Sequence, residues 1–143
     1  MKNKEKGQII VVLALALVAI LALTALAVDG SMIYRERRED QTTADSVALA
    51  AATEAAKSTN CAVARASAIS KAMSYASAEE ALALANDSSS PSRVEAVCSG
   101  DGKTLDITIQ ITSDTPTTFA KMISTNQLTT TVTSTARVTI TAG

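Results

Sequence analysis

The sequence contains no histidine and no tryptophan, and its only aromatic side chains are Tyr34, Tyr75 and Phe119. Without histidine, catalytic arrangements of the Ser/His/Asp and Cys/His types are excluded. The 13 basic and 14 acidic residues give a net charge of −1, with no sustained basic run. Nucleic-acid binding usually needs a basic face and aromatic stacking platforms. These absences argue against an enzyme and against a nucleic-acid-binding protein.

The chain also has only two cysteines, Cys61 and Cys98. Two cysteines without histidine cannot complete a tetrahedral zinc site. In an oxidising compartment they would form one disulfide, which would stabilise the fold by about 4 kcal/mol on the loop-entropy estimate; in the cytosol they would be two small buried thiols. We favour the disulfide.

The other candidate site residues lack a pattern that indicates chemistry. Gly100 and Gly102 predict a turn, because no Lys-Ser/Thr pair follows them to open a phosphate-binding helix. Six carboxylates lie on helix faces that are predicted to be exposed and are interpreted as solvated rather than catalytic: Glu36, Glu39, Asp40, Asp45, Glu79 and Glu80. We expect no cofactor and no metal.

What the chain does have is an apolar segment over residues 8–28, whose only polar side chains are Gln8 and Thr24. As a helix it would span about 31 Å, close to the roughly 30 Å hydrocarbon core of a bilayer. Its Leu, Ile and Val side chains together favour insertion by about 4 to 8 kcal/mol. We predict a transmembrane helix, in preference to a buried helix of a soluble core. Small residues would permit close helix packing at Ala14, Ala16, Ala19, Ala22 and Ala25.

The flanks of this segment bear on its orientation. Residues 1–7 carry three lysines and read as a basic cytoplasmic leader, but Arg35, Arg37 and Arg38 follow the segment and nearly balance them. The disulfide and a Thr-rich tail favour an extracytoplasmic C-terminal domain. A rival interpretation is a secretory signal cleaved after Ala27, although the apolar run is longer than usual for a signal.

Asp29 stands where the apolar segment ends. It either marks the end of the span or makes a polar contact with a neighbouring helix or with Arg35 in an assembly. Gly30 beside it costs about 1 kcal/mol in a helix relative to Ala, which a bend or a close helix contact would offset.

Residues 29–90 predict an Ala-rich helical region. No proline precedes Pro91, so the membrane helix should continue to about Lys57. Ser58 to Asn60 predicts a break and a new N-cap, followed by a second, Ala-rich helix or helix pair from Cys61 to about Ala85. Residues 86–92 are rich in Ser, Asn, Asp and Pro and predict a linker.

Residues 91–143 change to a period of two, which predicts antiparallel strands. The expected strands are Arg93 to Cys98, the alternating run around Leu105 to Ile111, and Leu128 to Thr141. A short helix is expected from Thr117 to Ser124, with Phe119, Met122 and Ile123 on it. A sheet with one apolar face needs a cover, and the Ala-rich helices are the available one. The predicted fold class is α+β, with the long N-terminal helix and Ala-rich helices packed on a small three-stranded sheet.

The ends of the apolar span carry a recognisable set of residues: Gly7-Gln8 before it, Ala27-Val-Asp29 at its end, and Tyr34 with Arg37 and Arg38 beyond. With the residues that follow, they resemble the N-terminal region of the TadG-like and TadE-like proteins of the Tad/Flp pilus, over roughly residues 6 to 57. The most specific part of the resemblance is the block Gln41 to Ala52, which contains Gln41, Ala44, Asp45, Ala48 and Leu49. The resemblance implies a pilin-like architecture and a structural role in a bacterial surface filament or in its assembly machine.

It also implies cleavage of the leader by a prepilin peptidase after Gly7, ahead of Gln8. One departure matters: such proteins often carry a Glu at the fifth residue after the cut, and Val12 stands there. Val12 favours the TadG-like branch, whereas the pilin-sized remainder of the chain favours a filament subunit.

Three functions remain open at this stage. The first is a pilin or pseudopilin subunit that bundles through its apolar helix, with membrane lipid and other pilin-like subunits as partners. The second is a single-pass anchor or assembly component of the pilus machine in the cytoplasmic membrane. The third is a secreted Thr-rich adhesive domain. We favour the first.

Overall fold

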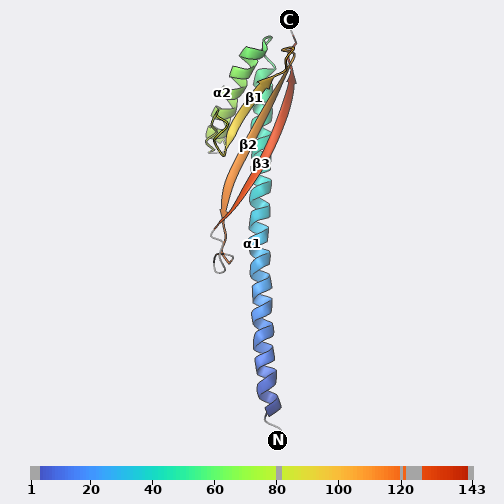
Figure 1. Cartoon of the computed structure of the whole chain (residues 1–143), viewed down its shortest axis with the longest axis vertical. Coiled ribbons are helices and arrows are strands. Elements are labelled where there is room, and N and C mark those ends of the chain that lie inside the picture. The colour runs from blue at the N-terminus through green and yellow to red at the C-terminus, as the bar shows by residue number, and fades with distance from the viewer. Residues whose placement is uncertain (1–3, 80–81, 120, 122–126, 142–143) are drawn as a thin grey trace. The chain divides into compact units, whose positions relative to one another are not determined.

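The computed structural model describes residues 4–79, 82–119, 121 and 127–141. The chain divides into two compact units. One unit comprises residues 1–35 with 115–128, and the other comprises residues 36–114 with 129–143. The elements follow in the order of two helices and then three strands (Figure 1).

Helix α1 runs from Lys4 to Ala55 and contributes to both units. The expectation that the helix continues beyond the apolar segment is confirmed. Its polar side chains do not interrupt it, because hydroxyl groups donate to carbonyls of the preceding turn: Thr24 to Leu21 at 2.9 Å and Ser31 to Val28 at 2.8 Å. Gly30 is accommodated within the helix.

Helix α2 runs from Cys61 to Glu79. Its start is the predicted cap, since Asn60 Oδ1 accepts the amide of Ala62 at 2.8 Å. The predicted end at Ala85 is wrong. Residues 82–84 are not helical, and the Ala85 amide instead donates to Ser92 O at 3.2 Å while Ala85 O accepts the Val94 amide at 2.9 Å. Leu84 is thereby buried, which helix propensity alone did not foresee.

The three strands are β1 (Arg93–Cys98), β2 (Thr104–Pro116) and β3 (Gln127–Thr139), in the sheet order β1-β2-β3. β1 and β2 are antiparallel, with a register from Arg93↔Gln110 to Cys98↔Leu105. The predicted hairpin turn is present, and Gly102 has a φ of 68° there. Because this left-handed conformation is strained for residues with a Cβ, glycine suits the position.

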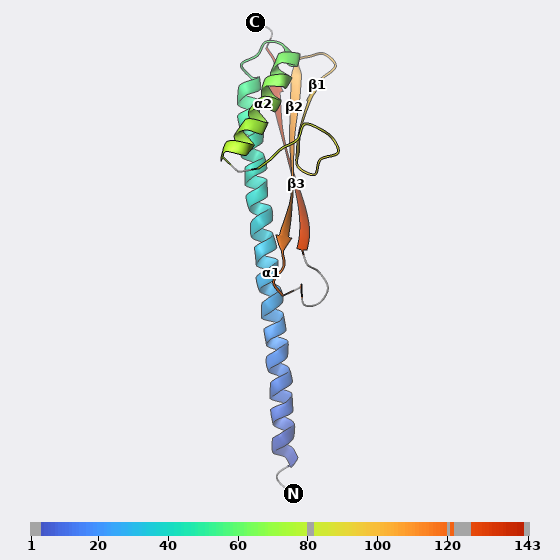
Figure 2. The ribbon, with the colours of Figure 1, turned by 90° about the vertical axis from the view of Figure 1, so that its left-hand side faces the viewer.

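The core of the second unit joins the apolar face of the sheet to alanine faces on both helices. Leu105, Ile107 and Ile109 of β2 are fully buried. α2 packs against β1, as Figure 2 shows. The helix positions that are fully buried are nearly all alanine: Ala44, Ala51, Ala55, Ala64, Ala68, Ala72 and Ala76. The prediction that Ala-rich helices cover the sheet is confirmed, because these alanines and Val47 form one buried cluster with the apolar residues of the strands.

The opposite face of the sheet is polar. β3 alternates as predicted, with Val132 and Val138 buried and the intervening Thr and Arg side chains exposed. Hydroxyl pairs join the strands across this face, between Thr108 and Thr135 and between Thr112 and Thr131, each at 3.1 Å.

The short helix predicted after Pro116 is wrong over residues 117–119, which are not helical. Met122, Ile123 and Ser124 lie outside the described residues. The amides of residues 118 and 119, which a helix would leave unpaired in its first turn, have acceptors elsewhere, as described below.

Candidate membrane and assembly site

The apolar segment of α1 presents its large side chains to the surroundings. Ile9, Leu15 and Leu23 are 65, 66 and 71% exposed, and every other Leu, Ile and Val from residue 9 to 26 is similarly uncovered. The helix is long and apolar enough to cross a membrane by length and composition. An apolar surface of this extent indicates contact with lipid or with other apolar helices.

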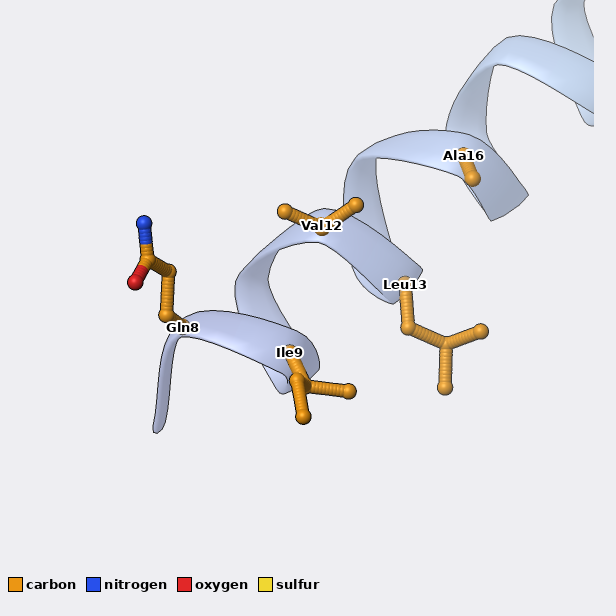
Figure 3. A pocket seen from close by; sticks show the side chains of 5 residues that line it. All are labelled: Gln8, Ile9, Val12, Leu13 and Ala16. Atoms are coloured by element: carbon orange, nitrogen blue, oxygen red, sulfur yellow. The ribbon is translucent and has the colours of Figure 1, made fainter. Parts of the chain in front are cut away.

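A shallow hollow near the start of this segment is formed by one helix alone. It is lined by Gln8, Ile9, Val12, Leu13 and Ala16, whose side chains point outward from α1 (Figure 3). Because a single helix cannot enclose a ligand, we interpret the hollow as part of the exposed apolar surface. Val12, at the position for which the resemblance implies a Glu, is 62% exposed.

Gly7 and Gln8 both lie within α1 and are exposed. A Cβ added at Gly7 would meet nothing within 4 Å. The structure therefore gives Gly7 no packing role of its own.

The five alanines expected to permit helix packing do not share one stripe. At about 100° per residue, Ala14, Ala22 and Ala25 fall within one broad arc of the helix, while Ala19 lies beside it and Ala16 faces the other way. All except the half-buried Ala25 are exposed.

Asp29 is an acidic residue of the first unit that is nevertheless buried, with only 7% of its surface exposed. The connection after β2 supplies donors: the Thr118 amide lies 3.2 Å from Oδ1, and the Phe119 amide lies 3.0 Å from Oδ2. A buried charge is costly unless hydrogen bonds replace its water. Asp29 therefore anchors this connection to α1 at the end of the apolar segment.

Sequence reasoning missed these partners of Asp29 and considered only a neighbouring helix or Arg35. Pro116 and the polar Thr117-Thr118 pair after it could have indicated these contacts. Proline interrupts the hydrogen bonding of a strand, so the backbone amides that follow it need other acceptors. Thr115 and Thr117, each 5% exposed, complete the buried polar cluster. The Thr115 hydroxyl has no hydrogen-bond partner within the described residues.

The block that resembles the Tad-type proteins divides between two sides of α1. Ala44 and Ala48 are buried in the core of the second unit. Gln41 Nε2 donates to Asp45 Oδ1 at 3.0 Å on the exposed side, and Leu49, one turn further, is 67% exposed. Half of the block thus packs the sheet and half remains available for contacts.

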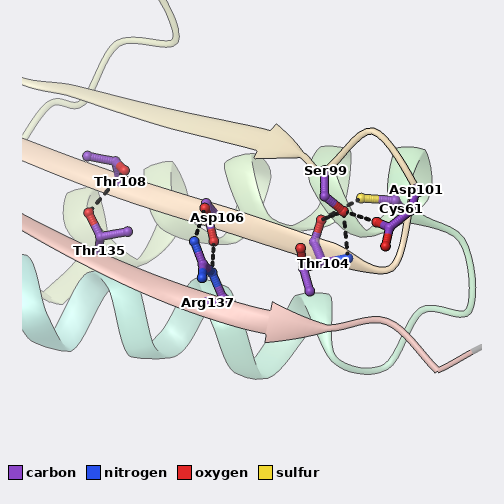
Figure 4. Close-up of polar contacts among 8 residues, drawn as sticks. All are labelled: Cys61, Ser99, Asp101, Thr104, Asp106, Thr108, Thr135 and Arg137. Carbon is purple, nitrogen blue, oxygen red and sulfur yellow. Dashed lines mark hydrogen bonds and ion pairs between the residues drawn. The ribbon is translucent and has the colours of Figure 1, made fainter.

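A disulfide joins Cys61 at the start of α2 to Cys98 at the end of β1. Beside it, the turn after β1 is closed by Ser99, whose amide donates to Thr104 O at 2.9 Å and whose Oγ accepts the Thr104 amide at 3.0 Å (Figure 4). The covalent and hydrogen-bonded links together hold one end of the hairpin against α2.

Several exposed carboxylates have lowered pKa values for local reasons. Hydrogen bonds from the Ser89 and Ser90 hydroxyls and from their amides lower the pKa of Asp87 to about 2. The Arg137 guanidinium donates to Asp106 Oδ1 and Oδ2 at 2.6 and 2.8 Å, which lowers the pKa of Asp106 (Figure 4). These groups form turns and surface pairs rather than a catalytic constellation. Within the described part of the chain, no group of three or more His, Cys, Asp or Glu residues is arranged to hold a metal ion.

The fold is α+β, and within the described residues one helix, α1, is long and apolar enough to cross a membrane. Residues 7–55 match the family model Tad, described as putative Flp pilus-assembly TadE/G-like. The match supports the TadE/G-like family that the sequence resembles, and with it involvement in a Tad pilus system. No curated protein and no solved structure matches the chain.

This family is structural or related to assembly rather than enzymatic. The match over residues 7–55 supports interaction with other subunits of the pilus machinery. Together with the apolar helix, it suggests a membrane or cell-surface location.

Proposed function

We propose that the protein is a pilin-like or pseudopilin subunit of a Tad/Flp-type surface filament. The observation that supports this proposal is the exposed apolar surface of α1 over residues 8–28, on a helix that matches the TadE/G-like family. In a filament core, the corresponding helices of other subunits would cover this surface. Alanines on more than one side of the helix, such as Ala16 and Ala22, would let several neighbours approach closely.

The proposal includes processing and topology. Residues 1–7 are a basic cytoplasmic leader, which a prepilin peptidase removes between Gly7 and Gln8. Residues 8–28 cross the cytoplasmic membrane before assembly, in contact with lipid. Residues 29–90 and 91–143 form the extracytoplasmic part, where an oxidising environment allows the Cys61–Cys98 disulfide to form.

Val12 favours one alternative, a single-pass anchor or assembly component that stays in the membrane. The missing Glu would otherwise partner the new N-terminal amine of an adjacent subunit. An apolar residue at this exposed position suits lipid as well as it suits a helix bundle.

Intact mass, measured on protein from sheared surface filaments and from membranes, tests the proposal. A mass lacking residues 1–7 in the filament fraction is the expected result. A mass that retains the leader, found only in membranes, would refute the filament subunit and support the membrane anchor instead. Loss of everything through Ala27 would instead indicate a secreted domain.

A pair of glycine variants sharpens this test. Gly7→Ala should block removal of the leader, whereas Gly30→Ala should be processed normally. Both positions lie in α1 with open space around an added Cβ, so neither change should disturb packing. Equal processing of the two variants would contradict cleavage after Gly7.

A further inference from the structure

The connection after β2 is held at the level where the apolar segment of α1 ends. Asp29 directly follows Val28, the last residue of that segment. The Asp29 carboxylate accepts the backbone amides of Thr118 at 3.2 Å and of Phe119 at 3.0 Å, and all of these residues belong to the first unit. The two hydrogen bonds therefore fix the backbone of residues 118 and 119 beside the end of the apolar surface.

The side chains of this connection include two buried threonines and an exposed aromatic ring. Thr115 and Thr117 carry hydroxyl groups and are each only 5% exposed, whereas Phe119 is 42% exposed. In water, threonine is mostly exposed and phenylalanine is among the residues most often buried. This reversal suits a ring that faces apolar surroundings rather than water.

A second aromatic side chain lies near the same level of α1. Tyr34 is 69% exposed and follows Asp29 by five residues, which is a rise of about 7.5 Å along the helix. With Val28 at the edge of the hydrocarbon core, the headgroup layer covers about the next 5 to 8 Å. Two of the three aromatic residues of the chain thus lie in or beside this layer, where aromatic rings are enriched in membrane proteins.

The polar groups next to Phe119 favour lipid over a second apolar helix. Lys121 is exposed, and its Cα lies within about 8 Å of the Cα of Phe119, because two residues span no more than this. The salt bridges of the described residues do not include Lys121. At this distance a lysine can reach lipid phosphates, and the exposed Thr118 hydroxyl can hydrogen-bond to a headgroup. Against an apolar helix, the same charge would lose water without gaining a partner.

We propose that the connection after β2 contacts the surface of the membrane that α1 crosses. The Phe119 ring inserts between the headgroups and the acyl chains of phospholipids, Lys121 lies at the phosphates, and Asp29 holds both at this depth. This inference rests on the membrane span in the proposed function, and it applies both to a subunit awaiting assembly and to an anchor.

The test exploits the absence of tryptophan from the chain. Phe119→Trp introduces a single tryptophan, whose fluorescence is measured on the full chain in vesicles of phosphatidylcholine and phosphatidylglycerol. Lipids brominated on their acyl chains close to the headgroup should quench this emission, and its maximum should lie at shorter wavelength than that of a tryptophan in water.

Two matched variants calibrate the measurement. Leu17→Trp, in the middle of the apolar segment, should be quenched most by lipids brominated near the ends of their acyl chains. Leu49→Trp replaces a residue that is 67% exposed but lies well beyond the apolar segment in the sequence, and neither lipid should quench it.

A charge reversal tests the phosphate contact in the Phe119→Trp background. Lys121→Glu should weaken the quenching, and more so in vesicles rich in phosphatidylglycerol, because the new carboxylate is repelled by anionic lipid. Lys103→Glu, an equal charge reversal in the second unit, should leave the quenching unchanged. Equal quenching in Lys121→Glu and Lys103→Glu would overturn the contact between Lys121 and phosphate.

The quenching results separate this inference from the membrane span. If Phe119→Trp is quenched no more than Leu49→Trp while Leu17→Trp is quenched, the inference is overturned and the span stands. If Leu17→Trp is not quenched either, the span is refuted and the inference with it. Protection of Phe119→Trp from both brominated lipid and aqueous acrylamide would also overturn the inference, because a second copy of the chain would then cover the ring.

Discussion

Replacing Asp29 by Ala should release the connection after β2 from α1. The carboxylate accepts two backbone hydrogen bonds, from Thr118 and Phe119, and belongs to a residue that is only 7% exposed. A hydrogen bond to a charged group contributes about 1.5 to 3 kcal/mol, and such contributions are not fully additive. We therefore expect local opening of residues 117–119 to become easier by about 2 to 4 kcal/mol.

This free energy corresponds to roughly 30- to 1,000-fold faster hydrogen exchange at the Thr118 and Phe119 amides, at a tenfold change for each 1.4 kcal/mol. Hydrogen exchange of these two amides can be measured directly by NMR on the protein in detergent micelles. Asp29→Asn, which keeps one carbonyl oxygen as an acceptor, should give a smaller increase.

Asp45→Ala is the matched control for Asp29→Ala. Asp45 lies on the same helix, but its Oδ1 accepts from the exposed Gln41 side chain rather than from a backbone amide. Exchange at residues 118 and 119 should not change in this variant. The reasoning fails if Asp29→Ala leaves their exchange unaltered, or if it raises exchange equally in α2 and the sheet, since a general loss of stability is not release of one connection.

Three further predictions concern the second unit. Replacing Cys61 and Cys98 together by Ser should lower the free energy of unfolding by about 2 to 5 kcal/mol, measured by denaturant titration without reductant, and added reductant should affect only the parent protein. Gly102→Ala should cost about 1 to 2 kcal/mol because of its positive φ, whereas Gly100→Ala should cost less; equal losses would contradict a conformational cause. Because the pKa of Asp87 is lowered to about 2 in the fold, its stabilising effect should be complete above pH 4 and lost as the pH falls toward 2. Denaturation midpoints from pH 2 to 5 should thus fall more steeply for the parent than for Asp87→Asn.

Most of the sheet follows from the sequence because burial imposes a period of two. The alternation from Leu105 to Ile111 predicted both the strand and its buried face, and Gly100 and Gly102 predicted the turn. The start of α2 was equally predictable, because Asn60 has a specific hydrogen bond to make at a helix N-terminus.

The failures have a common physical cause, which is that backbone groups find hydrogen-bond partners outside their own segment. Residues 82–85 have helical propensity, yet they leave the helix because Ala85 pairs with the segment leading into β1. Residues 117–119 are not helical, and the amides of Thr118 and Phe119 have Asp29 as an acceptor about 90 residues earlier. No local pattern encodes these partners.

The alanine faces of α1 and α2 have a consequence for mutagenesis. At Ala44, Ala51, Ala64 and Ala72, alanine scanning changes nothing, although these positions make up the contact between helices and sheet. The informative scan runs in the opposite direction, toward Val or Leu, because each added methyl group has to push a helix away from the strands. The interface is therefore constrained by an upper limit on side-chain volume rather than by a required shape.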